Sequence, residues 1–502
     1  MSEPRALMII DIDGLRRDVF EAALQSGSLP SFERILGGPT GEAAFQVPAV
    51  STAPSITFTA QASIVTGTHP GVHGIIGNES FDRFGRISDG RPRHFGFDVG
   101  DTLAADDAVN VFRQGLASRA LRSRAPTLYE KFALRRLPSA VFYHMYARGA
   151  SFWRPPNLID IARFTKGRGV LGLEAGQYDA GMLRNLGAYL HTAERPSVVM
   201  AYFMGLDHHS HLHGPDTQAE YLAGTLDAQM GQLLTVLEQQ GWLDDTLFAI
   251  VSDHGQINAI PDDRHSLRLG FPFDLELVHV FSALGLDVHD KPGEDPGCDA
   301  VMGLNGGLAH VHLQRHDGRW ADPPYFEADV LRVAQAFHDM NTRGRYAPEL
   351  QETLELVLVR NVEAHGWDAD YEVVLESGQR WPLSAYLEAH PELAYIDAAN
   401  RLSLMISEAA GDLLLIARGR DGYYFGGPQR GVHGGLLAGE SEPVLVLAYP
   451  GGNGESITHL HQTFERALRE RCAAEGGRQP SVADMVPLVE SLLGWCEERP
   501  HA

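Results

Sequence analysis

Along the chain, short apolar runs alternate with longer segments in which the apolar residues lie on one face. Compact apolar runs at residues 6–12, 197–204 and 246–251 are typical of strands buried on both faces of a parallel sheet. Between the last two runs, residues 217–240 place leucine and methionine side chains along one side of a helix. A strand, a helix and a strand in this order predict a right-handed βαβ unit. We therefore expect an α/β fold whose mostly parallel sheet is flanked by helices.

Two long regions depart from this pattern. Residues 77–123 hold many Gly, Asp and Arg residues with little periodicity, which indicates a long loop or cap segment. After it, residues 126–137 predict a helix, residues 139–145 a strand and residues 177–194 another helix. Residues 286–409 hold short apolar runs between turn residues and one helical segment, which favours an α+β subdomain. The apolar runs at 412–417 and 443–448 return to the core pattern. The expected division is a core of residues 1–285 and 410–502, with a loop or cap insertion at about 77–195, and an inserted α+β subdomain of residues 286–409.

The composition narrows the class of protein. Over 502 residues, an apolar content of 44% and a charged content of 21% are typical of a soluble globular protein. The net charge of -24 argues against a nucleic-acid scaffold and against docking on anionic lipid. This net charge does not exclude an anionic small-molecule substrate, because bound metal ions can reverse the local electrostatic potential. The three cysteines, far apart, form neither a disulfide framework nor a metal motif.

The start of the chain predicts a cytoplasmic location. Its apolar run at residues 6–10 is followed at once by Asp11 and Asp13, so it is too short for a signal peptide or a membrane span. We expect no membrane contact, and the sequence carries no signal for the oligomeric state.

Four separate segments end in side chains that can bind metal ions. After the first apolar run, Asp13 is a better candidate than Asp11 because Gly14 frees the backbone to turn there. The other segments supply Asp207 with His211, Asp253 with His254, and His433 between glycines. Any one of these residues alone could be only a turn or capping residue. Together, carboxylates and imidazoles favour Zn²⁺, with Mn²⁺ or Fe as alternatives, and so many groups predict two divalent metal ions.

A candidate nucleophile lies where an irregular segment gives way to a predicted helix. Thr57 and Thr59 are both at this point, and a helix N-terminus favours an alkoxide and an incoming phosphate. Both threonines could equally be helix caps. The residues alone leave this choice open.

These motifs together resemble the alkaline phosphatase superfamily, specifically its nucleotide pyrophosphatase/phosphodiesterase (type I phosphodiesterase) branch. The similar segments are Asp13-Gly14-Leu15-Arg16, Thr57-Phe58 with Ser63-Ile64-Val65-Thr66-Gly67 and His73-Gly74-Ile75, Asp207-x-x-x-His211 with Gly214-Pro215, Ser252-Asp253-His254-Gly255, and Gly431-Val432-His433-Gly434. The resemblance covers roughly residues 5–85, 195–256 and 410–495. It implies an alkaline-phosphatase-like core and a metal-dependent phosphodiesterase/pyrophosphatase-type hydrolase.

The resemblance also implies a role for each candidate. Asp207, His211 and His433 would hold one metal ion, and Asp13, Asp253 and His254 would hold the second beside the Thr57 oxygen. In the family pattern the nucleophile lies six residues before the Ser of the Ser-Ile-Val-Thr-Gly run, which selects Thr57 over Thr59. Thr57 would then ligate a metal ion, attack phosphorus and form a covalent phospho-enzyme.

The sequence departs from the family pattern at Ala60, where an Asn that donates to a phosphate oxygen is usual. Gln61 or Asn78 could replace it, with Asn78 as the candidate substrate-binding residue. No Lys or Arg lies between Thr57 and Asp82, which favours a singly charged diester, nucleotide-type substrates included. A sulfatase is disfavoured because no formylglycine motif surrounds the nucleophile.

Other functions stay open at this point. Within the enzymes, the alternatives are a phosphonoacetate-hydrolase-like activity and a phosphomonoesterase or phosphomutase. From another class, the chain could be a non-catalytic, metal-stabilised binding protein.

Overall fold

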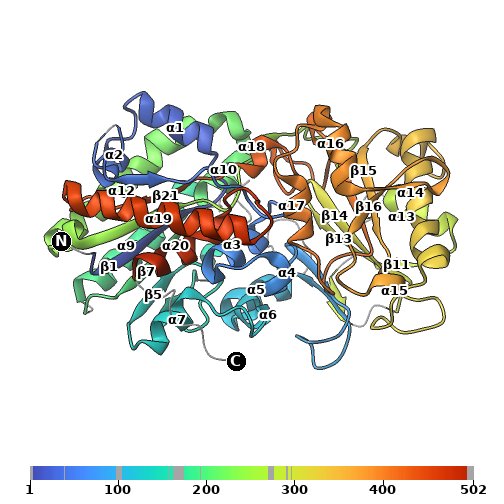
Figure 1. Ribbon diagram of the computed structural model, residues 1–502, viewed down its shortest axis with the longest axis horizontal. Coiled ribbons are helices and arrows are strands. Elements are labelled where there is room, and N and C mark those ends of the chain that lie inside the picture. Colours follow the sequence, from blue (N-terminus) through green and yellow to red (C-terminus); the bar gives the residue numbers. More distant parts are fainter. Residues whose placement is uncertain are drawn as a thin grey trace.

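The chain forms two sheet-based units that lie side by side in an elongated molecule (Figure 1). Each unit is built on one seven-stranded sheet. This computed structural model describes residues 4–38, 40–97, 105–157, 159–161, 174–192, 194–269, 276–289, 292–294 and 297–493.

The first sheet is mostly parallel. Its strands, in spatial order, are β2 (Ala44–Gln46), β21 (Leu445–Ala448), β8 (Thr246–Val251), β1 (Ala6–Ile12), β7 (Val198–Phe203), β5 (Ser139–Phe142) and β6 (Phe152–Arg154). The five strands from β8 to β6 run parallel, whereas β21 and β2 are antiparallel additions at one edge. The expected α/β fold with a mostly parallel sheet is confirmed.

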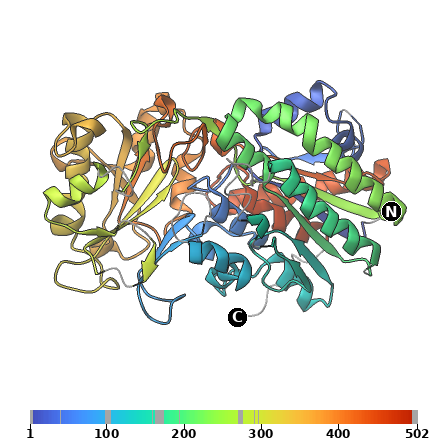
Figure 2. The same cartoon turned by 180° about the vertical axis from the view of Figure 1, so that it is seen from behind.

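Both faces of this sheet are buried under helices. Along β1, Leu7 and Ile9 face one apolar core, and Met8, Ile10 and Ile12 face the other. The first face is covered by α3 (Thr57–Thr66), α5 (Ala105–Arg113), α6 (Leu116–Ala120), α7 (Leu128–Leu134), α19 (Gly454–Ala474) and α20 (Met485–Leu492). The second is covered by α1 (Arg17–Gln25), α2 (Pro30–Leu36), α9 (Ala175–Thr192) and α12 (Asp227–Gln239). Figure 1 is seen from the side of α19, and Figure 2 from the side of the green helices.

The helix predicted at 217–240 forms as a series of helical turns. It comprises α11 (Gln218–Tyr221), a π-helical turn (Leu222–Leu226) and α12. The leucines and the methionine of the predicted apolar face are buried against the sheet.

The second unit contains a mixed, largely antiparallel sheet. Its strands, in spatial order, are β11 (Val288–His289), β13 (Ala300–Asn305), β14 (Leu308–Leu313), β18 (Leu413–Ala417), β15 (Leu354–Arg360), β16 (Tyr371–Val374) and β17 (Arg380–Pro382). One face packs on α13 (Glu276–Ala283) and α14 (Arg332–Arg343), and the other packs on α16 (Leu383–Ala389) and α17 (Ala398–Ser403). The second core also takes in Ala53 and Ile76 from the N-terminal part of the chain.

Short strands and helices lie outside the two seven-stranded sheets. They include α4 (Pro70–His73), β3 (Glu79–Asp82), β4 (Arg93–Gly96), α10 (Gly205–His213), β9 (Ile257–Asn258), β10 (Ser266–Leu267), β12 (Gly293–Glu294), α15 (Val362–His365), β19 (Tyr424–Phe425), β20 (Gly431–Val432) and α18 (Ala438–Ser441). The pairs β9–β20 and β10–β19 join segments more than 150 residues apart in sequence.

One expectation about strand membership was wrong, and another was confirmed. The run at 412–417 forms β18, which pairs with β14 and β15 in the second sheet instead of returning to the first. The strand expected at 139–145 forms β5, which pairs with β6 and β7 in the first sheet. A continuous apolar run shows that a strand is buried but does not show which sheet it joins. The division into domains therefore stays a prediction.

None of the helices that the structure describes is long and apolar enough to cross a membrane. Cys298 and Cys472 are free thiols, and Cys496 lies outside the described residues.

Candidate active site

The predicted metal ligands gather at the carboxyl ends of the central strands. Asp13 directly follows β1, Asp253 and His254 follow β8, and Asp207 lies in the first turn of α10 after β7. Four residues after Asp207, His211 points from the same helix, and His433 follows β20. The parallel strands thus bring residues from distant parts of the chain to one edge of the sheet.

Thr57 is the first residue of α3 and faces this group. Its Oγ1 lies 3.1 Å from His254 Nε2. It is partly exposed, whereas the next nine residues of the helix are buried. The buried Thr59 hydroxyl has no hydrogen-bond partner among the described residues, and no side chain caps α3, so Thr59 is not the cap that the sequence allowed.

All three predicted histidine ligands are held in the same tautomer. The Nδ1–H groups donate to the carbonyls of neighbouring backbone: His211 to Gly431 (2.7 Å), His254 to Gly255 (2.9 Å) and His433 to Ser55 (3.1 Å). A carbonyl can only accept, so each Nδ1 carries the proton and each Nε2 presents a lone pair. This arrangement is the usual support for a metal-binding imidazole.

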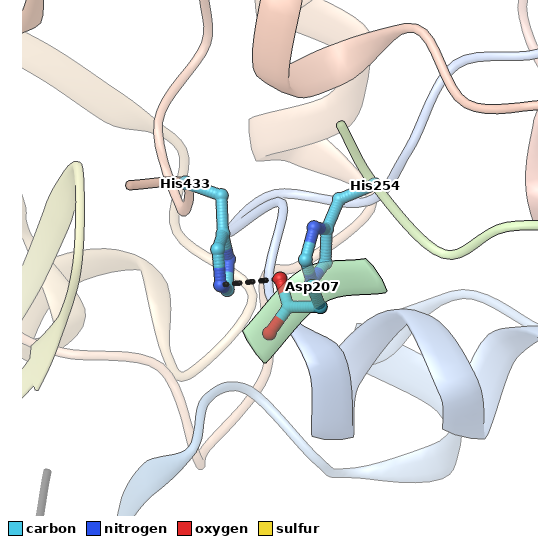
Figure 3. A group of neighbouring side chains, drawn as sticks. All are labelled: Asp207, His254 and His433. Atoms are coloured by element: carbon cyan, nitrogen blue, oxygen red, sulfur yellow. Dashed lines mark ion pairs between the residues drawn. The ribbon is translucent and has the colours of Figure 1, made fainter. Parts of the chain in front are cut away.

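The first group of potential ligands surrounds Asp207. His211 Nε2 lies 3.1 Å and His433 Nε2 lies 3.8 Å from its carboxylate oxygens, the second contact being the dashed line in Figure 3. The two ε-nitrogens are 3.3 Å apart, and two facing lone pairs repel unless a cation lies between them. Asp207, His254 and His433 also have ligand atoms close enough for one ion.

The second group is Asp13, Asp253 and His254, whose ligand atoms also lie within reach of one ion. His254 Nε2 is 3.5 Å from Asp13 and 3.3 Å from Asp253. Among the described residues, Asp13 Oδ1 and Asp253 Oδ2 are buried without a hydrogen-bond partner. Buried carboxylate oxygens without donors are costly unless they bind a cation, so this residue set fits a divalent metal ion. His254 lies between the two groups and belongs to both.

The carboxylates of the site strongly perturb one another. Burial first, and then the neighbouring carboxylates of Asp253 and Asp207, raise the pKa of Asp13 well above its usual range. Burial also raises the pKa of Asp253. Burial opposes ionisation of Asp207, but His211, His433 and His254 lower its pKa. Two divalent cations would offset this repulsion and leave all three carboxylates ionised.

Glycine is required beside the first carboxylate. Gly14 has a φ of 72°, and a Cβ at this position would lie 2.7 Å from Asp207 Oδ1. The Gly14 N–H also donates to Asp253 Oδ1 over 3.1 Å. Its left-handed turn therefore lets the acids after β1, β7 and β8 approach one another.

The residues around Thr57 differ in what they can offer a ligand. Asn78 is buried, and its Oδ1 accepts the N–H of Phe58, the residue after Thr57, at 3.0 Å. Gln61 points away, since its Nε2 donates to Asp11 (3.1 Å) and its Oε1 accepts from His144 (2.8 Å). Ala60 is fully buried in the apolar core. Of the two residues that could replace the Asn of the family pattern, Gln61 is held by hydrogen bonds within this buried network.

Several supporting residues escaped the sequence reasoning. Tyr202, inside β7, donates its hydroxyl to Asp13 Oδ2, and Gln256 Nε2 donates to Asp207 Oδ1. Gln256 follows Asp253-His254-Gly255 directly, which was a usable signal, whereas Tyr202 resembles an ordinary apolar strand residue. Of the other histidines near His211, His209 packs its ring against those of His213 and Tyr221, outside the ligand groups.

Comparisons with known proteins identify the family of the chain. The family model described as "Type I phosphodiesterase / nucleotide pyrophosphatase" matches residues 7–351. A comparison with curated proteins found no match.

The fold is shared with solved structures of two mammalian proteins. Murine ectonucleotide pyrophosphatase/phosphodiesterase 5 is 14% identical, with a TM-score of 0.56 over 99% of this chain and 97% of that one. An inactive variant of the murine protein in complex with AMP gives 14% and 0.55 with the same coverage. The human protein gives 14% and 0.52, over 99% of this chain and 96% of that one.

Proposed function

Since the chain belongs to the type I phosphodiesterase/nucleotide pyrophosphatase family, we propose that it hydrolyses small phosphodiesters by using Thr57 as a nucleophile at a site for two divalent metal ions. Membership of this family makes the chain a phosphodiesterase/pyrophosphatase-type hydrolase and makes metal dependence a property of its class. The nucleophile, the pair of ions and the substrate are the parts that we propose.

The observation that carries the proposal is the position of the Thr57 hydroxyl. Thr57 is the partly exposed first residue of an otherwise buried helix. Its hydroxyl lies 3.1 Å from His254 Nε2, whose lone pair is available to a metal ion. Asp207, His211 and His433 would hold one ion, and Asp13, Asp253 and His254 would hold the other beside Thr57. Bound there, the ions would supply positive charge that lowers the pKa of the Thr57 hydroxyl and favours departure of the leaving oxygen.

The reaction needs two displacements at phosphorus. In the first, the bond from Thr57 Oγ1 to phosphorus forms, and the bond to the leaving alcohol breaks as that oxygen takes a proton. In the second, a water oxygen binds phosphorus, and Thr57 leaves and recovers its proton. The N-terminal end of α3 would place the partial positive charge of the helix beside the phosphoryl oxygens in both steps.

Nucleotide-type diesters are the favoured substrates. The structure of the similar murine protein in complex with AMP supports a nucleotide-sized ligand at this fold. Asn78, fixed beside Thr57 by the Phe58 N–H, would donate to a phosphoryl oxygen in place of the residue missing at Ala60. Zn²⁺ is the ion that best suits a mixed set of imidazoles and carboxylates. The cytoplasmic location stays a prediction.

An assay with a matched variant tests the proposal. Metal-reconstituted wild type and Thr57→Ala are compared on aryl phosphodiester, phosphomonoester, phosphonate and sulfate substrates. We expect the wild type to prefer the diester, and Thr57→Ala to lose its hydrolysis while keeping the metal content. Undiminished hydrolysis by Thr57→Ala would remove Thr57 from the mechanism. A preference for the phosphomonoester, phosphonate or sulfate would replace the substrate class.

A further inference from the structure

Arg401 is a buried arginine that joins three segments around the site. It lies on α17, in the part of the chain that builds the second unit, and is only 4% exposed. Its guanidinium donates to the carbonyls of Ser51 (3.0 Å), Thr52 (2.7 Å), Ile396 (3.0 Å) and Gly435 (3.4 Å), and to the hydroxyls of Ser55 (2.6 Å) and Ser441 (2.9 Å). One planar group thereby binds the segment that leads to Thr57, the loop after His433, and α18.

Two of these contacts lead directly to the candidate metal ligands. Arg401 donates to the hydroxyl of Ser55, and the backbone carbonyl of Ser55 accepts the His433 Nδ1–H. The same hydroxyl donates to the Gly435 carbonyl over 2.8 Å, which ties the nucleophile segment to the His433 loop. On the other side, the Ser51 hydroxyl donates to the Asp253 carbonyl over 2.6 Å. Arg401 therefore contacts the supports of a ligand from each metal group.

The guanidinium of Arg401 donates only to neutral groups among the described residues. Carbonyl and hydroxyl dipoles therefore stabilise its buried charge. Burial lowers the pKa of Arg401 to about 10, and Glu440 acts in the opposite direction, so the group stays charged at neutral pH. Glu440 itself accepts the N–H groups of Gly435 and Leu437 and so holds the same loop.

We propose that Arg401 is a positioning residue, which fixes the distance between the Thr57 segment and the His433 loop and thereby assembles both metal groups. The inference rests on the proposed two-metal site. A lysine has three N–H donors on a single nitrogen and cannot reproduce the six contacts that Arg401 spreads over its three guanidinium nitrogens. Arg401→Lys should therefore loosen the supports of His433 and Asp253 while leaving the ligands themselves in place.

Arg360 offers a matched control in the same unit. It is also fully buried, and it donates to the carbonyls of Gly411, Trp367, Ser407 and Ala410 over 2.6 to 2.9 Å. None of these acceptors belongs to a segment that carries a candidate ligand or the nucleophile. Arg360→Lys should thus lower the melting temperature without changing the site, which separates positioning from general stability.

The experiment measures metal release from preloaded protein by a coloured zinc chelator, at a temperature where every variant is folded. Supporting residues of metal ligands typically change metal affinity by about 10- to 100-fold. We expect Arg401→Lys to release metal at least about tenfold faster than both the wild type and Arg360→Lys, with kcat reduced and KM nearly unchanged. In Arg401→Ala, millimolar free guanidinium ion should slow the release again, because it can occupy the vacated position.

Each outcome decides a different claim. If Arg401→Lys and Arg360→Lys release metal at the same rate and have the wild-type kcat, Arg401 is only structural and the inference fails. If the wild type itself takes up no metal, the proposed function fails before Arg401 is tested, and the positioning role falls with it. Should Arg401→Lys not accumulate as folded protein, Ser55→Ala removes the hydroxyl that accepts from Arg401 and donates to the Gly435 carbonyl, and this variant must show faster release for the inference to stand.

Discussion

Replacing Tyr202 with phenylalanine removes the hydrogen bond between the sheet and Asp13 without disturbing the packing. Tyr202 is fully buried in β7, and its ring lies edge-on to His144 at 5.2 Å, a contact that phenylalanine keeps. Burial and the nearby Asp13 raise the pKa of the Tyr202 hydroxyl well above its usual range, so it stays protonated and donates. The variant leaves Asp13 Oδ2 buried without its donor.

The expected magnitude follows from this single contact. A hydrogen bond to a charged, buried group is worth about 1.5–3 kcal/mol. If the carboxylate is a metal ligand, its support should be worth about 10- to 100-fold in metal affinity. Tyr371→Phe is the control, because Tyr371 is also buried and donates to the neutral Gly411 carbonyl over 2.7 Å in the second unit. That variant should lose about 0.5–1.5 kcal/mol of stability and no metal affinity.

The assay is dialysis of both variants against buffers of graded free Zn²⁺, followed by measurement of bound metal and of urea unfolding. We expect Tyr202→Phe to need at least about tenfold more free metal for half-occupancy. Equal metal titrations for wild type and Tyr202→Phe would refute the idea that Asp13 is a ligand whose orientation this hydroxyl sets.

Three further predictions concern stability. Burial raises the pKa of Asp179 to about 7, so the folded protein loses stability as the pH rises from about 4 to 7. Asp179→Asn removes this loss. The variant should be more stable than wild type by up to about 4 kcal/mol at pH 8 and by almost nothing at pH 4. Unfolding in urea at both pH values checks this, and a constant difference would contradict it. Ala60→Asn should destabilise by about 1–3 kcal/mol and bring no activity, because the position is fully buried; a gain in diesterase rate would show that the site is open there. Asp412→Ala leaves the buried Arg83 charge without its ion-pair partner, which lies 2.6 Å away in the wild type. The free energy of unfolding, measured by thermal unfolding, should fall by about 3–5 kcal/mol, and adding Arg83→Met should recover part of the loss.

The sequence predicted the class of the fold, and it predicted which residues would lie together at the strand ends. Asp13, Asp253 and Asp207 were predictable as neighbours because each follows a recognisable buried strand, and parallel strands bring their carboxyl ends together. The helix that begins at Thr57 was also predicted at its observed start.

The missing parts depend on contacts between distant segments. The apolar run of β18 has no feature that assigns it to the second sheet, because its partners β14 and β15 are about 60 to 100 residues earlier in the chain. Likewise, Arg401 and Tyr202 have no local motif, and their roles come from which carbonyl or carboxylate the fold places beside them. Gln61 was a candidate for phosphate binding only because its burial against Asp11 and His144 could not be read from the sequence.

A direct search for the covalent intermediate tests the central claim about Thr57. Metal-loaded enzyme is mixed with an excess of aryl phosphodiester, quenched in acid within the first turnovers, digested and examined by mass spectrometry. The account predicts a phosphoryl ester adduct on the peptide that contains Thr57, located on that residue by fragmentation and lost in Thr57→Ala. Steady turnover with no adduct on this peptide under any quench time, or an adduct on another residue, would contradict it.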